Sequence, residues 1–513
     1  MDSHQFREAA ISSIEKIVKY YETVEERPVA STVEPGYLRK LLPTEAPQHG
    51  EPWANIEKDI ETNVLPGITH WQSPNFSAWF PCSSSFPAML GEMYSTAFNC
   101  AAFSWICSPV VTELETIVMD WMARAFALPP CYLSTGPTYG GGVIHGTASE
   151  AIATVMVAAR DKYLREATAH ITDEEEREDA IALRRTKLVA LGSTASHSAT
   201  KKAAQIAGVR FRAVPVHAED GYRMTGAELR KMIAALHAKG LEVFYLTATL
   251  GTTDTCAIDD LDDIADALDE ITPSATLTPE KKRAGQGEIW VHVDAAYAGA
   301  ALVCPEYQYL TPVLARFHSF NMNMHKWLLV NFDCSLLYVR NRNWLIEALG
   351  SNLAILKNVY TDSGLVTDYR DWQIPFGRRF RSLKLWFVIR TYGISGLQAH
   401  IRKHVKFGED FGAMLRTRSD LFEIVTGPRF ALTVFKLNTN AKSQAATTEE
   451  VNALTKKFYD DVLADGEVFL SSTVVGGVFA VRYCPATPFV EARHVAKHFE
   501  IFVSVAEKTL AAV

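Results

Sequence analysis

The sequence has no long apolar run and no excess of basic residues. No segment is apolar over the ~18 residues that a transmembrane helix needs, and the first residues lack the basic stretch and apolar core of a secretory signal. A formal net charge of -8 provides no basic face for binding nucleic acid or anionic lipid. The composition therefore argues against nucleic-acid and membrane binders, favours a small-molecule substrate and predicts a cytoplasmic location.

Closely spaced cysteines are also lacking. The 8 cysteines are scattered and form no C-x-x-C pair. A chain of 513 residues that is 48% hydrophobic can bury a large core without disulfide bonds. We expect reduced cysteines, no metal site, and a large domain accompanied by a smaller one.

Both ends of the chain differ in pattern from the middle. Residues 1–87 begin with an amphipathic helical pattern and continue through proline-rich connections, with too few apolar runs for a core of their own. We predict an N-terminal helical arm that packs on something else, and a partner subunit is the candidate. Residues 391–513 mix helical and strand patterns, which predicts a small α+β domain.

The middle of the chain, residues 88–390, alternates helical patterns with short β-rich runs. These runs lie at 187–191, 243–250, 289–293 and 334–339. Such alternation predicts an α/β domain with a largely parallel sheet, in which ligands gather at the carboxyl ends of the strands.

A lysine and an aspartate carry the strongest chemical signal. Asp294 closes the strand predicted at 289–293, and Lys326 stands between His325 and Trp327 in a later run. An enzyme that uses pyridoxal 5'-phosphate (PLP) needs an amine for the cofactor aldehyde and a carboxylate for the ring nitrogen. Lys326 and Asp294 supply both groups. The alternatives are a surface lysine and a turn-capping aspartate, and the pairing of the two residues argues against them.

Two weaker signals accompany this pair. Residues 140–150 read as a glycine-rich turn that leads into a helix, which offers N–H groups and hydroxyls to a phosphate. A helix N-cap by Thr147 or Ser149 explains the hydroxyls equally well. His197 follows a strand and is a candidate to stack on a cofactor ring, although an isolated histidine at such a place is more often structural.

Taken together, these stretches resemble the aromatic L-amino-acid decarboxylases, a PLP-dependent family. The resemblance runs from the N-terminal arm into the start of the last domain. Its motifs include 67–71 (Gly-Ile-Thr-His-Trp), 103–105 (Phe-Ser-Trp), 248–253 (Ala-Thr-Leu-Gly-Thr-Thr), 292–297 (His-Val-Asp-Ala-Ala-Tyr), 323–327 (Asn-Met-His-Lys-Trp) and 377–384 (Gly-Arg-Arg-Phe-Arg-Ser-Leu-Lys).

The resemblance implies a fold type I PLP enzyme with a mostly parallel seven-stranded sheet. It also implies a homodimer whose N-terminal arms wrap over the partner subunit. By position, Lys326 would carry the cofactor, Asp294 would hold the ring nitrogen and His197 would stack on the ring. The further cofactor contacts would be Ala148, Ser149, Thr249, Ala296, Asn323 and His325.

The resemblance also implies a pocket for an aromatic amino acid such as tryptophan, DOPA or tyrosine. The residues placed there are Trp71, Trp79, Phe80, Pro81 and Cys82, with Phe103, Phe376 and Gly377 facing them from the partner subunit. Family members that take indoles commonly have a small residue at the Gly377 position. Cys82 replaces a usual threonine, Gln72 a frequent histidine and Met324 a common proline.

One departure bears on the product. The family has a catalytic tyrosine on a loop, and Ile355 stands at that position. Isoleucine cannot donate a proton to Cα, which favours an aldehyde synthase that releases an arylacetaldehyde, ammonia and hydrogen peroxide. Tyr360 is a nearby substitute for the missing hydroxyl. The leading interpretation is a decarboxylase that forms the amine, and a PLP-binding dimeric homologue without turnover is a further alternative.

Overall fold

The computed structural model divides into two compact units. It describes residues 1–272, 278–351, 360, 366–439 and 447–511. The larger unit comprises Ser83–Lys406 and Thr426–Leu432, and the smaller one comprises Met1–Cys82, Phe407–Val425 and Thr433–Val513. The three-part division into 1–87, 88–390 and 391–513 stays a prediction.

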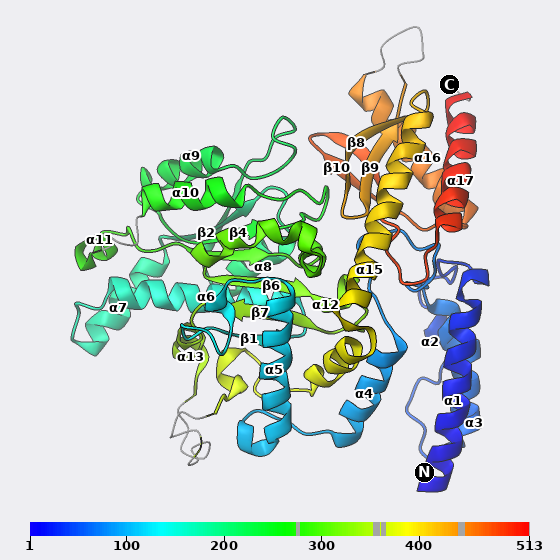
Figure 1. Cartoon of the computed structure of the whole chain (residues 1–513), viewed down its shortest axis with the longest axis horizontal. Helices are drawn as coiled ribbons and strands as arrows, with labels where there is room; N and C mark the ends of the chain where they lie inside the picture. The colour runs from blue at the N-terminus through cyan, green and yellow to red at the C-terminus, as the bar shows by residue number, and fades with distance from the viewer. Residues whose placement is uncertain (273–277, 352–359, 361–365, 440–446, 512–513) are drawn as a thin grey trace. The chain divides into compact units, whose positions relative to one another are not determined.

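A seven-stranded sheet forms the centre of the larger unit, in the order β1-β7-β6-β5-β4-β2-β3 (Figure 1). The strands are β1 (Gly141–His145), β2 (Leu188–Ser193), β3 (Arg210–Val214), β4 (Glu242–Thr249), β5 (Trp290–Asp294), β6 (Ser319–Asn323) and β7 (Ser335–Val339). Strands β3, β2, β4, β5 and β6 are neighbours in this order and pair in parallel. Strand β7 is antiparallel to both β6 and β1. The predicted α/β fold with a mostly parallel sheet is confirmed.

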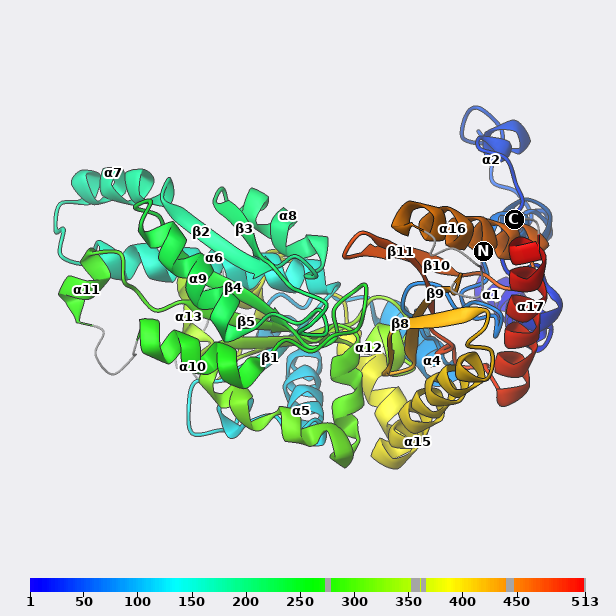
Figure 2. The ribbon, with the colours of Figure 1, turned by 90° about the horizontal axis from the view of Figure 1, so that it is seen from above.

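Helices cover both faces of this sheet. Helices α6 and α8 pack together on one face, whereas α9 and α10 pack together on the other, the side from which Figure 2 looks down. This arrangement follows from the right-handed crossovers between parallel strands. The helices are α4 (Phe86–Phe98), α5 (Pro109–Ala125), α6 (Ala148–Ala167), α7 (Glu174–Arg185), α8 (Ser198–Ile206), α9 (Gly226–His237), α10 (Leu261–Ile271), α11 (Pro279–Arg283), α12 (Met324–Trp327), α13 (Asn343–Leu349) and α15 (Arg381–Thr417), which continues into the smaller unit.

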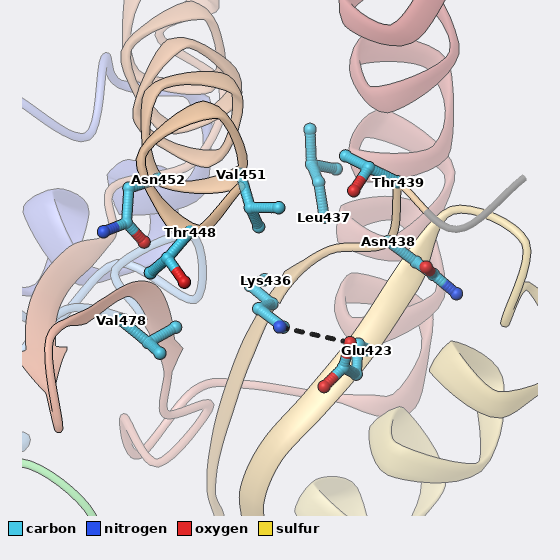
Figure 3. Close-up of a pocket in the computed structure, with 9 residues that line it drawn as sticks. All are labelled: Glu423, Lys436, Leu437, Asn438, Thr439, Thr448, Val451, Asn452 and Val478. Atoms are coloured by element: carbon cyan, nitrogen blue, oxygen red, sulfur yellow. Dashed lines mark ion pairs between the residues drawn. The ribbon is translucent and has the colours of Figure 1, made fainter. Parts of the chain in front are cut away.

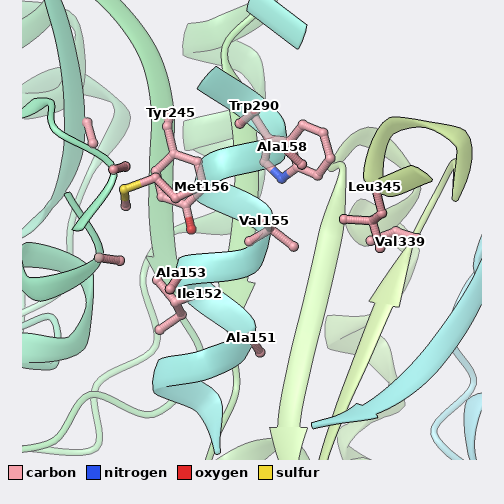
Figure 4. Close-up of a cluster of buried hydrophobic side chains, with 14 of the residues drawn as sticks. Ala151, Ile152, Ala153, Val155, Met156, Ala158, Tyr245, Trp290, Val339 and Leu345 are labelled. Carbon is pink, nitrogen blue, oxygen red and sulfur yellow. The ribbon is translucent and has the colours of Figure 1, made fainter. Parts of the chain in front are cut away.

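The main core lies between α6 and the sheet (Figure 4). Val155 and Met156 of α6 are fully buried, and they belong to one cluster with Tyr245 of β4 and Trp290 of β5. Leu345 of α13 joins the same cluster. The small residues Ala151, Ala158 and Ala159 allow α6 to approach the sheet closely, which fixes the position of the amino end of this helix.

One predicted element is wrong in its first half. The glycine-rich turn expected over 140–150 begins instead with strand β1, which is fully buried and pairs with β7. A Cβ atom on Gly142 would lie 2.3 Å from Cε of Met119 and 2.8 Å from Cδ1 of Tyr338. Glycine is therefore required at this position by close packing within a strand, and the turn is confined to the residues just before α6.

The smaller unit combines helices with a four-stranded antiparallel sheet, in the order β10-β11-β9-β8. Its elements are α1 (Ser3–Thr23), α2 (Tyr37–Leu41), α3 (Trp53–Asp59), β8 (Phe422–Arg429), β9 (Leu432–Leu437), α16 (Thr448–Asp465), β10 (Ser471–Val475), β11 (Val478–Tyr483) and α17 (Ala492–Ala511). Phenylalanines 411, 435, 458 and 502 form its core. In the part of the chain that the structure describes, no helix is both long and apolar enough to cross a lipid bilayer.

The core assignment predicts a contrast between two leucines. Leu345 is fully buried against α6, whereas Leu183 of α7 is 68% exposed. We expect Leu345→Ala to lower the free energy of unfolding by ~2–5 kcal/mol. Leu183→Ala should change it by less than ~0.5 kcal/mol. Urea titrations followed by circular dichroism measure both values, and an equal loss in the two variants would contradict the assignment.

Candidate active site

The site lies where neighbouring parallel strands end. Thr249, Asp294 and Asn323 are the last residues of β4, β5 and β6. Thr249 is paired with Asp294 in the sheet register. The carboxyl ends of parallel strands meet at one edge of a sheet, so these three side chains are brought to the same edge.

Asp294 is almost completely buried at this edge. Its exposed fraction is 5%, and its Oδ1 accepts a hydrogen bond from the Ala296 N–H at 3.0 Å. The Asp294 carbonyl accepts a bond from the Leu250 N–H at 2.9 Å, which ties the end of β5 to the end of β4. The carboxylate is thereby fixed in direction before any ligand arrives.

His197 caps the amino end of α8. Its Nδ1 accepts a hydrogen bond from the Ala199 N–H at 3.1 Å, so the neutral imidazole carries its proton on Nε2. Partial burial lowers the pKa of His197, and the positive charge of Lys326 lowers it further. The carboxylates of Asp294 and Asp254 act in the opposite sense. His197, Asp294 and Lys326 are thus electrostatic neighbours.

Lys326 lies on α12, a single helical turn directly after β6. The Ser83 hydroxyl donates to the Lys326 carbonyl at 2.7 Å, and the Ser83 N–H donates to the His325 carbonyl at 2.8 Å. His325 accepts the Cys334 N–H through Nδ1 at 2.9 Å. Burial and the nearby Lys326 lower the pKa of His325 to about 3, so this imidazole is neutral.

The amino end of α6 is available to an anion. The Thr147 hydroxyl accepts the Glu150 N–H at 3.2 Å, so this hydroxyl serves as the helix cap. Glu150 itself binds the Gly146 N–H at 2.9 Å and contacts His145 at 3.2 Å. The N–H groups of Ala148 and Ser149 belong to the first turn, where helical N–H groups lack partners within the helix and favour negative charge.

Two buried polar atoms at this edge test whether the residues fit a cofactor. Among the described residues, neither Oγ1 of Thr249 nor Oδ1 of Asn323 has a hydrogen-bond partner. Buried polar groups are normally paired, so such atoms mark a place for a polar ligand or water. Together with a lysine amine, a fixed carboxylate and a helix amino end, they fit PLP, which has an aldehyde, a ring nitrogen and a phosphate.

The predicted substrate residues form two aromatic groups, one in each unit. In the larger unit, the rings of Phe103 and Phe376 lie 4.8 Å apart, and a Cβ atom on Gly377 would meet nothing within 4 Å. In the smaller unit, Trp71 and Trp79 stack with their centroids 5.3 Å apart.

Phe80, Pro81 and Cys82 follow Trp79 directly. The Phe80 ring lies under the Arg482 guanidinium at 5.2 Å, and Nε2 of Gln72 donates to the Cys82 carbonyl at 2.6 Å. The side-chain amide of Gln72 thus fixes the end of this segment.

The position expected for the catalytic tyrosine, Ile355, lies outside the described residues. The ring of Tyr360, the predicted substitute, packs against Trp105 with the centroids 4.8 Å apart.

Sequence reasoning missed Ser83, which holds the turn of Lys326 by two hydrogen bonds. A single serine far from the lysine in sequence gives no local signal.

A pocket of about 240 Å³ lies in the smaller unit, where Lys436 pairs with Glu423 at 3.2 Å (Figure 3). None of the predicted site residues lines it.

The fold and the site define a PLP-dependent enzyme of fold type I. The family described as the pyridoxal-dependent decarboxylase conserved domain matches residues 35–438. The chain belongs to this family.

Similar proteins match the chain over almost its whole length. Tryptophan decarboxylase 2 of Oryza sativa subsp. japonica is 40% identical over 99% of this chain and 96% of its own. Aromatic-L-amino-acid decarboxylase of Rattus norvegicus is 41% identical over 100% and 99%, and phenylacetaldehyde synthase of Arabidopsis thaliana is 41% identical over 98% and 96%. A crystal structure of Oryza sativa TDC with PLP and tryptamine superposes with a TM-score of 0.91 at 35% identity, over 99% of each chain.

The capping role of His197 predicts different stabilities for two variants. His197→Ala removes the acceptor of the Ala199 N–H and should lower the free energy of unfolding by ~0.5–2 kcal/mol. His197→Asn keeps a capping oxygen and should lose only a small part of this. Thermal unfolding of the cofactor-free proteins measures both effects, and equal losses would contradict the capping role.

Proposed function

We propose that this protein decarboxylates aromatic L-amino acids with PLP and releases the arylalkylamine and CO2. The observation that carries the proposal is the grouping of Lys326, Asp294 and His197 at the carboxyl edge of the sheet. The substrate class is supported by two relatives that are named tryptophan decarboxylase and aromatic-L-amino-acid decarboxylase. They are 40% and 41% identical to this chain over almost its whole length.

Each residue at the edge receives a role that its surroundings support. The Lys326 amine binds the cofactor aldehyde, a reaction in which the neutral amine is the nucleophile. The Asp294 carboxylate keeps a proton on the pyridine nitrogen. Bound PLP supplies a cationic ring that accepts the electron pair left at Cα when CO2 departs.

The other residues at the edge hold the cofactor and orient the substrate. We assign the phosphate to Ala148, Ser149 and Asn323, place Thr249 near the ring, and count Ala296 and His325 as further cofactor contacts. His197 covers the ring, and its lowered pKa keeps the imidazole neutral at neutral pH. Because Nδ1 is engaged by the helix cap, only Nε2–H is left to donate to a substrate carboxylate.

Two aromatic groups support the aromatic substrate class. We assign the substrate side chain to Trp71, Trp79, Phe80, Pro81 and Cys82, with Phe103, Phe376 and Gly377 facing them from the partner subunit. The open space at Gly377 leaves room for an indole. That these residues form one pocket, with the second group supplied by a partner subunit, stays a prediction.

An aldehyde synthase is the second candidate. Ile355 has no proton to give to Cα, and the chain is 41% identical to a protein named phenylacetaldehyde synthase. The third candidate is a PLP-binding homologue without turnover, which the presence of Lys326, Asp294 and His197 argues against.

The products distinguish the three candidates. The holoenzyme is incubated in air with tryptophan, 5-hydroxytryptophan, DOPA, tyrosine or phenylalanine, and CO2, amine, aldehyde and peroxide are quantified. We expect CO2 with an equal amount of amine and no peroxide. Aldehyde with matching peroxide would assign the protein to the aldehyde synthases, and the absence of CO2 with every substrate would reject turnover.

Lys326→Ala is the control for the chemistry. This variant should lose both turnover and the visible absorption band of the enzyme-bound cofactor. Lys201→Ala, which changes an exposed lysine of α8, should keep both. A Lys326→Ala protein that still turns over would contradict the assignment of this residue.

We also propose that the protein is a homodimer. Helix α1 exposes the apolar side chains Phe6, Ile11, Ile14, Ile17 and Val18. Its other side is already engaged, because Ser12 and Lys16 bind Glu57 of α3.

A second exposed apolar face lies on α4 of the larger unit, which exposes Phe86, Leu90, Met93, Tyr94 and Phe98. Apolar faces of this size on a folded chain mark an interaction surface, and a second copy is the partner that family resemblance favours. The cytoplasmic location stays a prediction.

A charge on α1 should therefore weaken the dimer. Ile11 is 56% exposed on this helix, and Leu183, at 68%, is a matched exposed residue on α7. We expect Ile11→Asp to raise the dissociation constant of the dimer, measured by sedimentation velocity over a concentration series, by about tenfold, which corresponds to roughly 1.4 kcal/mol. Leu183→Asp should leave the dimer unchanged. A monomeric parent protein would reject the proposal.

A further inference from the structure

The residue after Lys326 is held by a histidine from a distant helix. Trp327 is fully buried, and its Nε1–H donates to Nδ1 of His404 on α15 at 3.0 Å. The Trp327 ring also stacks on Tyr297, with the centroids 4.6 Å apart and an interplanar angle of 16°. We call Tyr297, Trp327 and His404 the indole clamp. All three residues belong to the larger unit.

The hydrogen bond fixes the state of His404. An indole N–H is a donor only, so Nδ1 of His404 must be the acceptor and be unprotonated. His404 is fully buried, and the neighbouring His400 ring lies 4.4 Å away. Trp327 is fully buried as well, so both partners of this hydrogen bond are shielded from solvent. In such surroundings the indole has no water to replace a lost acceptor.

Helix α12 depends on contacts of this kind. It has only 4 residues, and within the described residues no side chain caps its amino end. A single turn does not hold itself together, because the cost of forming the first turn is not repaid by propagation. Its shape must therefore be imposed by the groups that it contacts.

The two neighbours of Lys326 are both anchored. His325 is bound through Nδ1 to the Cys334 N–H, and Trp327 is bound through Nε1 to His404. Successive side chains on a helix point about 100° apart. Fixing the side chains on both sides of Lys326 therefore fixes the direction in which its amine leaves the turn.

The clamp also connects the lysine with the aspartate. Tyr297 stands three residues after Asp294, and its hydroxyl donates to the Phe430 carbonyl at 2.6 Å. The stack of Tyr297 on Trp327 joins the turn that follows β5 to the turn that follows β6. The spacing between the carboxylate and the amine is thus set partly by one indole ring.

We propose that His404 is a positioning residue that, through Trp327, sets the direction of the Lys326 amine toward the cofactor aldehyde. The proposal rests on the role of Lys326 proposed above. It predicts that loss of the Nδ1 acceptor disturbs cofactor attachment even when the protein stays folded.

The test compares His404→Phe with His404→Asn. Phenylalanine keeps an aromatic ring but leaves the Trp327 N–H without an acceptor, whereas the Oδ1 of asparagine can take the place of Nδ1. Apoprotein is mixed with PLP, and the visible absorption band and its rate of appearance are recorded. Steady-state kinetics with the best amino acid and thermal unfolding are measured in parallel.

We expect His404→Phe to attach the cofactor about tenfold more slowly and to lower kcat about tenfold, with KM changed by less than about twofold. His404→Asn should stay within about threefold of the parent protein in each quantity. Trp327→Phe removes the donor in place of the acceptor and should reproduce the His404→Phe effect. The double variant should be no worse than either single one.

His318→Phe is the matched control. His318 is buried, stacks on Trp290 at 5.2 Å and accepts the Val291 N–H through Nδ1, but it lies at the amino edge of the sheet. This variant should lower the melting temperature without changing the cofactor band or the rate of attachment.

Either of two results would overturn the proposal. One is a His404→Phe protein that loses melting temperature as His318→Phe does but attaches PLP at the parental rate. The other is a Trp327→Phe protein with parental attachment, which decides the matter even if His404→Phe does not fold. A Lys326→Ala protein that retains the visible band would instead reject the role of Lys326.

Discussion

The parallel alignment of β4, β5 and β6 is the constraint on which the site depends. Thr249 and Asp294 are paired in register, and Asn321 is paired with Asp294 from the other side. A shift of β5 by one residue would turn Asp294 to the opposite face of the sheet. The core formed by α6 with Tyr245 and Trp290 opposes such a shift, because it would expose large buried side chains. The geometry of the site is therefore maintained by packing that lies some distance from the chemistry.

The edge of the sheet keeps its imidazoles neutral and restricts charge to a few groups. Burial is the main cause of the lowered pKa of His197, His292 and His325. For His197 and His325, one ring nitrogen accepts a backbone N–H, and protonation would break that bond. Both nitrogens of His292 are also engaged, by Ser319 and Asn321. Because these rings stay neutral, they add no positive charge to this part of the sheet.

Sequence reasoning found the elements with strong local patterns and missed those that depend on tertiary context. The predicted runs at 187–191, 243–250 and 289–293 correspond to β2, β4 and β5, in which apolar residues predominate. Strand β3 begins Arg-Phe-Arg at the edge of the sheet, and β6 alternates polar residues with Phe320 and Met322, so neither is an apolar run. Strand β1 begins with two glycines, a composition that favours a turn, and only its pairing with β7 makes it a strand.

The same limit applies to the site. The sequence predicts Lys326 and Asp294 as site residues because the chemistry needs a lysine and a carboxylate, each next to a recognisable strand. Ser83 and His404 act on the turn of Lys326 from segments that are remote in sequence. A serine and a helical histidine are common in any chain, and only the folded structure gives them their partners. Residues that position a catalytic group are thus harder to predict from sequence than the group itself.

The segment around Gly377 shows how an exposed site can still be well ordered. The Phe376 ring rests on Phe103, and Arg378 pairs with Glu115 at 2.6 Å while lying over the Tyr369 ring. Glu115 also accepts the Ile144 N–H of β1 at 2.8 Å, so this ion pair is tied to the edge of the sheet. Removing one partner of a buried ion pair costs about 3–5 kcal/mol, because it leaves an uncompensated charge. Gly377 is therefore flanked by two anchored side chains, and a Cβ atom at this position would meet nothing within 4 Å.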